Sequence, residues 1–255
     1  MNPEKYFQKP PESIFKYFRP ERAGILKDLK IRFANPATFN DPFEACPRFD
    51  LWAEEVANTA LKELTALHPA FGISPQQSSK FVGDYKKQGL KKRVKFHTQN
   101  FQKECGERFR MLCFSENVHS PLMWGHYCDC HAGFALEFDT NYPFFQSRLA
   151  KVHYDKERPR INGPFPGLSI PLTKNEEWSY EREWRIVQEA TSAMPHYEIL
   201  PAESIKAIYF GIRMSAPVRQ EIQAALEAKD RAHIEMFEMD LDTSTYKMIP
   251  IPVIQ

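Results

Sequence analysis

The segment at 176–187, EEWSYEREWRIV, places many charged side chains around two tryptophans and directly before an apolar β-branched pair. If 180–187 is extended, the alternation of side chains along a strand puts Glu181, Glu183 and Arg185 on one face. Burying two carboxylates and a guanidinium is costly unless they pair with one another or with a ligand. The segment therefore predicts a strand whose charged face either meets solvent or lines a site.

The composition is typical of a globular protein and excludes several classes. Of 255 residues, 42% are hydrophobic and 13% aromatic, which is not the composition of a disordered chain. The net charge of +1 gives no argument for a nucleic-acid or anionic membrane partner. No apolar run approaches the roughly 18 residues of a membrane span, and the N-terminus lacks a secretory-signal layout. Five irregularly spaced cysteines indicate reduced thiols, so we expect a cytoplasmic protein with no membrane partner.

Predicted strands outnumber predicted helices, and the two do not alternate strictly. Strands are predicted at 14–18, 31–34, 110–115, 134–138, 152–154, 180–187, 205–211, 234–239 and 246–253, and helices at 20–28, 122–131 and 215–229. This pattern favours the α+β class, with mixed or antiparallel sheets. We expect a single domain over 1–255.

The block 51–109 differs in character from the rest of the chain. Apolar residues such as Trp52, Val56 and Ala60 recur at near-helical spacing, and six lysines and arginines between 86 and 95 make the block basic. The basic side chains could bind nucleic-acid phosphates or simply form a solvated helical face. We favour the second interpretation and predict that 51–109 is a helical insertion or lid.

Two further groups of reactive side chains are weak candidates. The dense Cys/His set comprises His126, Cys128, Cys130 and His131. Zinc ligands converge from spaced motifs, whereas one helix would turn these four toward different faces. Cys113 and Ser115 lack the G-x-S-x-G elbow that would support a nucleophile. We therefore expect no metal site and no acyl-transfer nucleophile here.

The order of Arg19, Ser115 and then Glu181-x-Glu183 along the chain resembles the layout of NAD-dependent ADP-ribosyltransferases. The resemblance implies that Arg19 holds the phosphates of NAD and that Ser115 orients the nicotinamide ribose. Lys16 or Tyr17 could take the place of Arg19. The resemblance also implies that Glu183 bonds the ribose 2′-hydroxyl and stabilises an oxocarbenium-like transition state. Glu181 would then accept the proton of the acceptor.

Four more residues belong to the NAD site that this resemblance implies. Tyr17 or Trp124 would form an aromatic wall of the site. Asn40 and Asp41 would close it from the loop 35–44, which is rich in turn-forming Asn, Asp and Pro. A packed turn without a ligand is the alternative for this loop.

A second resemblance spans about 13–211 and rests on many short motifs in order. These motifs are Lys16-Tyr17, Phe39-Asn40-Asp41-Pro42-Phe43-Glu44, Cys113-Phe114-Ser115-Glu116, Met123-Trp124-x-His126-Tyr127, His131-x-Gly133-Phe134, Glu137-Phe138-Asp139, Val152-x-Tyr154, Lys174, and the run from Trp178 to Arg185. By them the chain resembles an uncharacterised, mainly bacterial family, domain of unknown function 2971. The family implies no activity of its own.

Three functions follow from these patterns. The leading hypothesis is an ADP-ribosyltransferase-like enzyme that uses NAD and modifies a protein or nucleic-acid acceptor, as a toxin or phage-defence effector. The first rival is a binding module in which 181–183 and Arg185 form a salt-bridge network that holds the loop 39–44. The second rival is a nuclease-like hydrolase that binds a divalent metal through Asp41, Glu44 and the two glutamates of 181–183.

Overall fold

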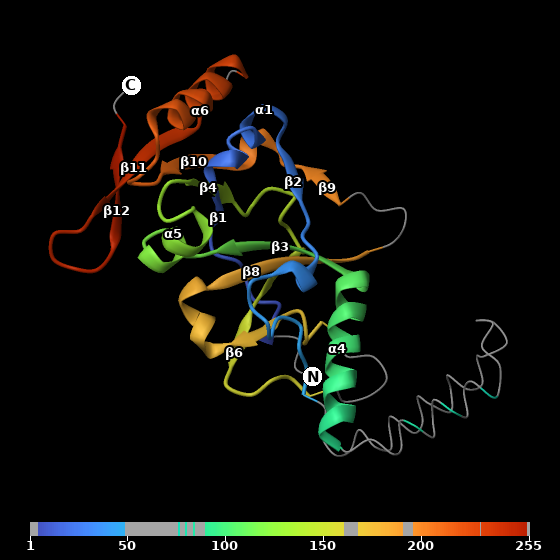
Figure 1. Cartoon of the computed structure of the whole chain (residues 1–255). Coiled ribbons are helices and arrows are strands. Elements are labelled where there is room, and N and C mark those ends of the chain that lie inside the picture. The colour runs from blue at the N-terminus through green and yellow to red at the C-terminus, as the bar shows by residue number, and fades with distance from the viewer. Residues whose placement is uncertain are drawn as a thin grey trace.

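The structure is a computed structural model that describes residues 5–48, 90–160, 168–190, 196–229 and 231–253, with positions 76, 80 and 84. Its centre is an eight-stranded sheet (Figure 1). The strands of this sheet are β1 (Ser13–Phe18), β3 (Phe109–Ser115), β4 (Phe134–Asp139), β5 (Leu149–Lys151), β8 (Glu183–Glu189), β10 (Ile205–Phe210), β11 (Glu235–Leu241) and β12 (Met248–Pro252). Their order is β12-β11-β10-β4-β1-β3-β8-β5, and only β10 and β11 pair in parallel.

Two small sheets and several short helices complete the fold. The small sheets pair β2 (Lys30–Arg32) with β9 (Tyr197–Ile199) and β6 (His153–Asp155) with β7 (Thr173–Asn175). The α-helices are α1 (Ile25–Asp28), α4 (Leu90–Arg108), α5 (Pro121–Tyr127) and α6 (Ala216–Ala228). The 3-10 helices are η2 (Pro20–Arg22), η3 (Pro36–Thr38), η5 (Glu176–Glu181) and η6 (Ala202–Ser204). A mostly antiparallel sheet with few helices agrees with the predicted α+β class.

The alternation of apolar residues along β1 builds a core on each face of the sheet. Ile14 and Phe18 belong to the larger core, which also takes in Leu26 of α1 and Ile222 of α6. Phe15 points the opposite way, into a second core that contains Trp124 of α5. Strand β1 therefore has apolar packing on both sides, which is the pattern of a central strand.

Three predicted elements differ from those observed. The strand predicted at 180–187 is wrong in its first part: η5 runs through Glu181, Arg182 is left-handed at φ 45°, and β8 starts only at Glu183. The helix predicted at 122–131 ends at Tyr127. The helix predicted at 20–28 is divided into η2 and α1.

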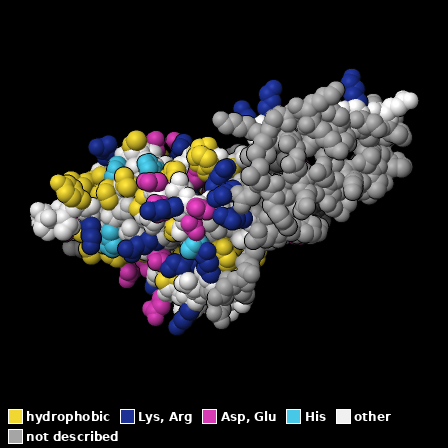
Figure 2. Space-filling model, turned by 90° about the horizontal axis from the view of Figure 1, so that it is seen from below, with side chains coloured by type: hydrophobic (Ala, Val, Ile, Leu, Met, Phe, Trp, Pro, Cys, Tyr) yellow, Lys and Arg dark blue, Asp and Glu magenta, His cyan; other side chains and the backbone are white. Residues whose placement is uncertain are grey.

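Of the block 51–109, which was predicted to be a helical insertion or lid, the structure describes only the last part. Helix α4 spans Leu90–Arg108, and 51–89 lies outside the described residues apart from positions 76, 80 and 84. No helix in the described ranges is long and apolar enough to cross a membrane. On the face seen in Figure 2, basic, acidic and hydrophobic side chains are interspersed over the coloured part of the surface, as the near-zero net charge suggests.

Candidate functional site

A cavity of about 340 Å³ lies beside the point where β1 and β3 separate. Strand β1 pairs with β4 over six residues, but with β3 only at Phe15 and Ser115. The lining residues are Phe15, Lys16, Tyr17, Arg19, Arg32, Ala34, Thr38, Phe39, Asn40, Met111, Cys113, Phe114, Ser115, Met123, His126, Tyr127, Lys174, Glu181 and Glu183. The splitting of the central sheet thus exposes polar side chains from several strands to one hollow.

Six of the eight predicted site residues line this cavity: Tyr17, Arg19, Asn40, Ser115, Glu181 and Glu183. Trp124 does not, because it is fully buried behind Tyr17, with the two ring centroids 5.3 Å apart, and its indole nitrogen donates to the Val118 carbonyl at 2.7 Å. Asp41 is also buried outside the lining, and one of its oxygens accepts from the Phe43 amide at 2.8 Å. The prediction that Trp124 and Asp41 contact a ligand is therefore wrong for this cavity, because both residues are buried and neither lines it.

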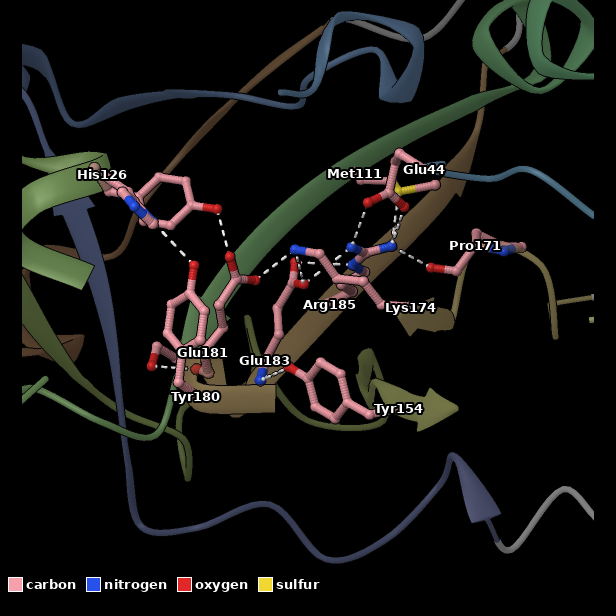
Figure 3. A network of polar contacts seen from close by, with 12 residues as sticks. Glu44, Met111, His126, Tyr154, Pro171, Lys174, Tyr180, Glu181, Glu183 and Arg185 are labelled. Atoms are coloured by element: carbon pink, nitrogen blue, oxygen red, sulfur yellow. Dashed lines mark hydrogen bonds and ion pairs between the residues drawn. The ribbon is translucent and has the colours of Figure 1, made fainter. Parts of the chain in front are cut away.

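A chain of ion pairs joins the lining residues Lys174, Glu181 and Glu183 to Arg185 and Glu44, which do not line the cavity (Figure 3). Arg185 is completely buried and donates to both oxygens of Glu183, from Nε at 2.8 Å and from Nη2 at 2.9 Å. Its Nη1 and Nη2 also bind the two oxygens of Glu44, at 2.6 and 3.0 Å. Lys174 donates to Glu183 at 3.3 Å and to Glu181 at 2.5 Å. Glu181, Glu183 and Arg185 are therefore buried but not unpaired, because Lys174, Glu44 and these three side chains compensate one another's charges.

Local backbone geometry brings Glu181 and Glu183 to the same cation. The Asn175 side chain accepts from the Glu177 amide and caps η5, and the left-handed turn at Arg182 then redirects the chain into β8. Ser115 fixes this turn, since its hydroxyl donates to the Glu181 carbonyl at 2.5 Å. The hydroxyl also accepts from the Asn117 amide at 3.0 Å. Ser115 thus touches the cavity while it holds the segment that carries the carboxylates.

The two glutamates have opposite electrostatic surroundings. Burial alone would raise the pKa of Glu183, but the charges of Arg185 and Lys174 outweigh burial and hold that pKa well below its usual range. Burial and the negative charge of Glu183 raise the pKa of Glu181 to about 7, although Lys174 and the Tyr127 hydroxyl oppose this rise. We assign any proton that the pair retains to Glu181, because Arg185 forms an ion pair with Glu183 and not with Glu181.

The pair thus combines a permanent anion with a carboxyl group that titrates near neutral pH. The Tyr127 hydroxyl donates to Glu181 at 2.5 Å, and His126 lies 2.9 Å from the Tyr180 hydroxyl. A carboxyl group whose pKa lies near the working pH is suited to exchange protons with a bound ligand. The geometry can therefore support acid–base chemistry at Glu181 beside a fixed negative charge.

Several lining residues carry little signal in the sequence. Lys174 is one of 34 basic residues, and nothing in its spacing predicts that it joins both glutamates. His126 and Tyr127 lie within the predicted helix 122–131 and in a motif of the second resemblance, but neither was assigned to the site. Arg32, at the end of β2, is brought to the cavity only by the tertiary fold.

The carboxylates of the predicted metal site do not form a ligand set. Glu44 and Glu183 are both occupied by Arg185, and in the described ranges no group of three or more His, Cys, Asp and Glu side chains could hold a metal ion. Of the Cys/His set, Cys128 donates its thiol to the Phe134 carbonyl and Cys130 is exposed. The metal-dependent hydrolase therefore has no support from this arrangement.

Comparison with models of known protein families, with curated proteins and with solved structures gave no match. The two family resemblances of the sequence accordingly stay predictions.

Proposed function

We propose that the cavity is the active site of an ADP-ribosyltransferase-like enzyme that takes NAD as its donor and a protein or nucleic acid as acceptor. The observation that carries the proposal is the meeting of Arg19, Ser115, Glu181 and Glu183 around one cavity, although they come from separate regions of the chain. A toxin or phage-defence role would be one use of such an activity.

The proposed chemistry uses the two carboxylates differently. Cleavage of the bond between nicotinamide and ribose develops positive charge on the ribose, and a fixed anion close to it lowers the barrier. Glu183 is the permanent anion, although Arg185 and Lys174 neutralise part of its field. Glu181, whose pKa lies near 7, would accept the proton of the attacking group. Arg19 and Tyr17 would contact the phosphates and the ring of the donor.

The test measures NAD-dependent thermal stabilisation and release of nicotinamide. A ligand that binds only the folded state raises Tm, so NAD should stabilise the native chain. Glu183→Gln and Glu181→Gln should each abolish nicotinamide release. Arg19→Ala should weaken the NAD-dependent shift without endangering the fold, because Arg19 is exposed. An exposed pair elsewhere, Lys27 and Glu221, provides the matched control Lys27→Ala.

No shift in Tm at millimolar NAD, together with no nicotinamide release, would overturn the proposal. That outcome would favour the non-enzymatic binding module, the second candidate. The specific observation in its favour is the ion pair between Arg185 and Glu44, which holds the loop that follows η3 as that hypothesis expects. Arg182 does not contribute as expected, since it is exposed and left-handed.

A further inference from the structure

We infer that the part of the cavity formed by β1 and β2 is a subsite for a diphosphate group, held by Lys16, Arg19 and Arg32. The inference rests on the proposed function only in placing a nucleotide in this cavity. It adds Arg32 to the cations that the sequence pattern offered, and it uses Lys16 together with Arg19 rather than in its place. The ligand class is a nucleoside diphosphate, either free or as part of a larger donor.

Lys16 is the innermost of the three cations and has no counter-ion among the residues that the structure describes. Its ammonium group donates to the Cys113 carbonyl at 3.0 Å, across the gap where β1 and β3 no longer pair. The rings of Phe18 and Phe114 lie 5.7 and 5.8 Å from its nitrogen. An ammonium can donate three hydrogen bonds, and no carboxylate within the described ranges forms an ion pair with this one.

A half-buried ammonium group without an anion costs free energy, because burial disfavours its charged form. Burial accordingly lowers the pKa of Lys16, although Glu183 opposes the effect at longer range. Glu183 does not serve as the counter-ion in the structure, since its oxygens bind Arg185 and Lys174 and form no ion pair with Lys16. An anionic ligand in the cavity would supply the missing partner.

Arg19 and Arg32 extend the positive charge toward the mouth of the cavity. Both are exposed, and neither forms an ion pair with a carboxylate in the part of the chain that the structure covers. Elsewhere a comparable guanidinium, that of Arg148, is bound at 2.8 and 3.0 Å by Glu198. The cavity arginines are therefore available to a ligand.

The charge balance of the lining favours a polyvalent anion over a single carboxylate. Four cationic side chains line the described part of the cavity against two carboxylates, and both carboxylates are already engaged by Lys174 and Arg185. The planar guanidinium fork binds phosphate oxygens in pairs, while lysine acts as a point charge. Three uncompensated cations thus match the charge of a diphosphate.

The apolar lining favours a ligand that also carries a ring. Tyr17 and Phe39 line the same cavity as the three cations. Aromatic side chains provide stacking surfaces for nucleobases. A nucleoside diphosphate combines both features, whereas inorganic diphosphate would use only the cationic end.

The experiment is a calorimetric titration of the full chain with ADP, followed by competition with inorganic pyrophosphate. Lys16→Met should weaken ADP binding by about tenfold or more, and Arg19→Ala and Arg32→Ala by roughly three- to tenfold each, since each removes one charge-assisted contact. Lys27→Ala, which removes a cation outside the cavity, should bind ADP like the native chain. Pyrophosphate should displace ADP, and a higher salt concentration should lower the affinity of the protein for both ligands.

Lys16→Met loses the hydrogen bond to the Cys113 carbonyl but also removes an uncompensated, half-buried charge, so its Tm should change little, and a stable variant keeps the test decisive. Unchanged ADP binding in all three cavity variants, or no ADP binding by the native chain, would overturn the subsite. ADP binding that depends on these cations, without nicotinamide release from NAD, would keep the subsite and reject the transferase. Nicotinamide release that is unaffected by Lys16→Met and Arg32→Ala would keep the transferase and reject the subsite.

Discussion

Arg185 and Glu44 form a bidentate ion pair across 141 positions of the chain, with both side chains buried. The same guanidinium also binds both oxygens of Glu183 and donates to the Pro171 carbonyl at 2.6 Å. One side chain thus joins the loop after η3, the segment before β7 and the first residue of β8. The side of the cavity that carries Glu181 and Glu183 is built on this connection.

Replacing Arg185 by Met should be strongly destabilising. The substitution leaves Glu44 and Glu183 buried without their main counter-ion, a situation that costs about 3–5 kcal/mol of unfolding free energy. Urea denaturation at pH 7 would measure the loss. The unfolding free energy of Arg185→Lys should lie between those of the native chain and Arg185→Met, because lysine cannot bind both carboxylates bidentately. Lys27→Ala breaks an exposed pair and should change stability by about 0–1 kcal/mol. A comparably small effect for Arg185→Met would show that the network is dispensable.

The sequence located the charged cluster but not its geometry. Alternation along a strand predicted that Glu181, Glu183 and Arg185 lie together, and they do. Glu181, however, reaches the site from the end of a 3-10 helix. Arg182 then adopts a left-handed conformation, which does not occur in a regular strand and which strand alternation cannot predict. Lys174 belongs to the motifs of the second resemblance, but its ion pairs with residues seven and nine positions further along depend on the turn at Arg182, which no regular period predicts.

The fold was predictable to a similar degree. The strongly apolar strands β3, β4 and β10 were predicted within a residue or two, because burial on both faces gives continuous apolar runs. Their order in the sheet was not, since the placement of β1 between β3 and β4 depends on pairing between distant segments. The split between β1 and β3, beside which the cavity lies, was equally beyond local pattern, because it also depends on pairing between distant segments.

Gly133 should not tolerate a side chain. Three consecutive left-handed residues, 129–131, end the turn after α5, and Gly133 then passes so close to β1 that an added Cβ would lie 2.0 Å from the Phe18 carbonyl oxygen. Gly133→Ala should therefore cost about 3 kcal/mol or more, since a backbone atom cannot move aside as a side chain can. Thermal unfolding gives the measurement. Gly24→Ala is the control, because its Cβ meets nothing within 4 Å, and it should be neutral or stabilise by up to about 1 kcal/mol.

Glu181 should make the protein less stable as the pH rises toward neutrality. Its pKa is raised by burial and by Glu183, from 4.5 to about 7 in the folded chain. The folded state therefore holds the proton more tightly, and the associated stability is complete below about pH 4.5 and is lost as the pH rises through 7. The Gln side chain of Glu181→Gln does not titrate, so the unfolding free energy of the native chain relative to this variant should fall between pH 5 and pH 8. A difference that is constant over this range would mean that Glu181 is ionised throughout.

Tyr127→Phe should move this titration to higher pH. The Tyr127 hydroxyl donates to Glu181 at 2.5 Å and favours the ionised carboxylate, so its removal should raise the pKa of Glu181 further. If Glu181 accepts a proton during turnover, the rate of nicotinamide release should fall at pH 7 and recover as the pH is raised. Tyr180→Phe is the matched control, because the Tyr180 hydroxyl lies against His126 and makes no hydrogen bond to Glu181 among the described contacts. Equal pH profiles for the two variants would show that the Tyr127 hydroxyl does not tune Glu181, whereas an upward shift confined to Tyr127→Phe would identify Glu181 as the titrating group.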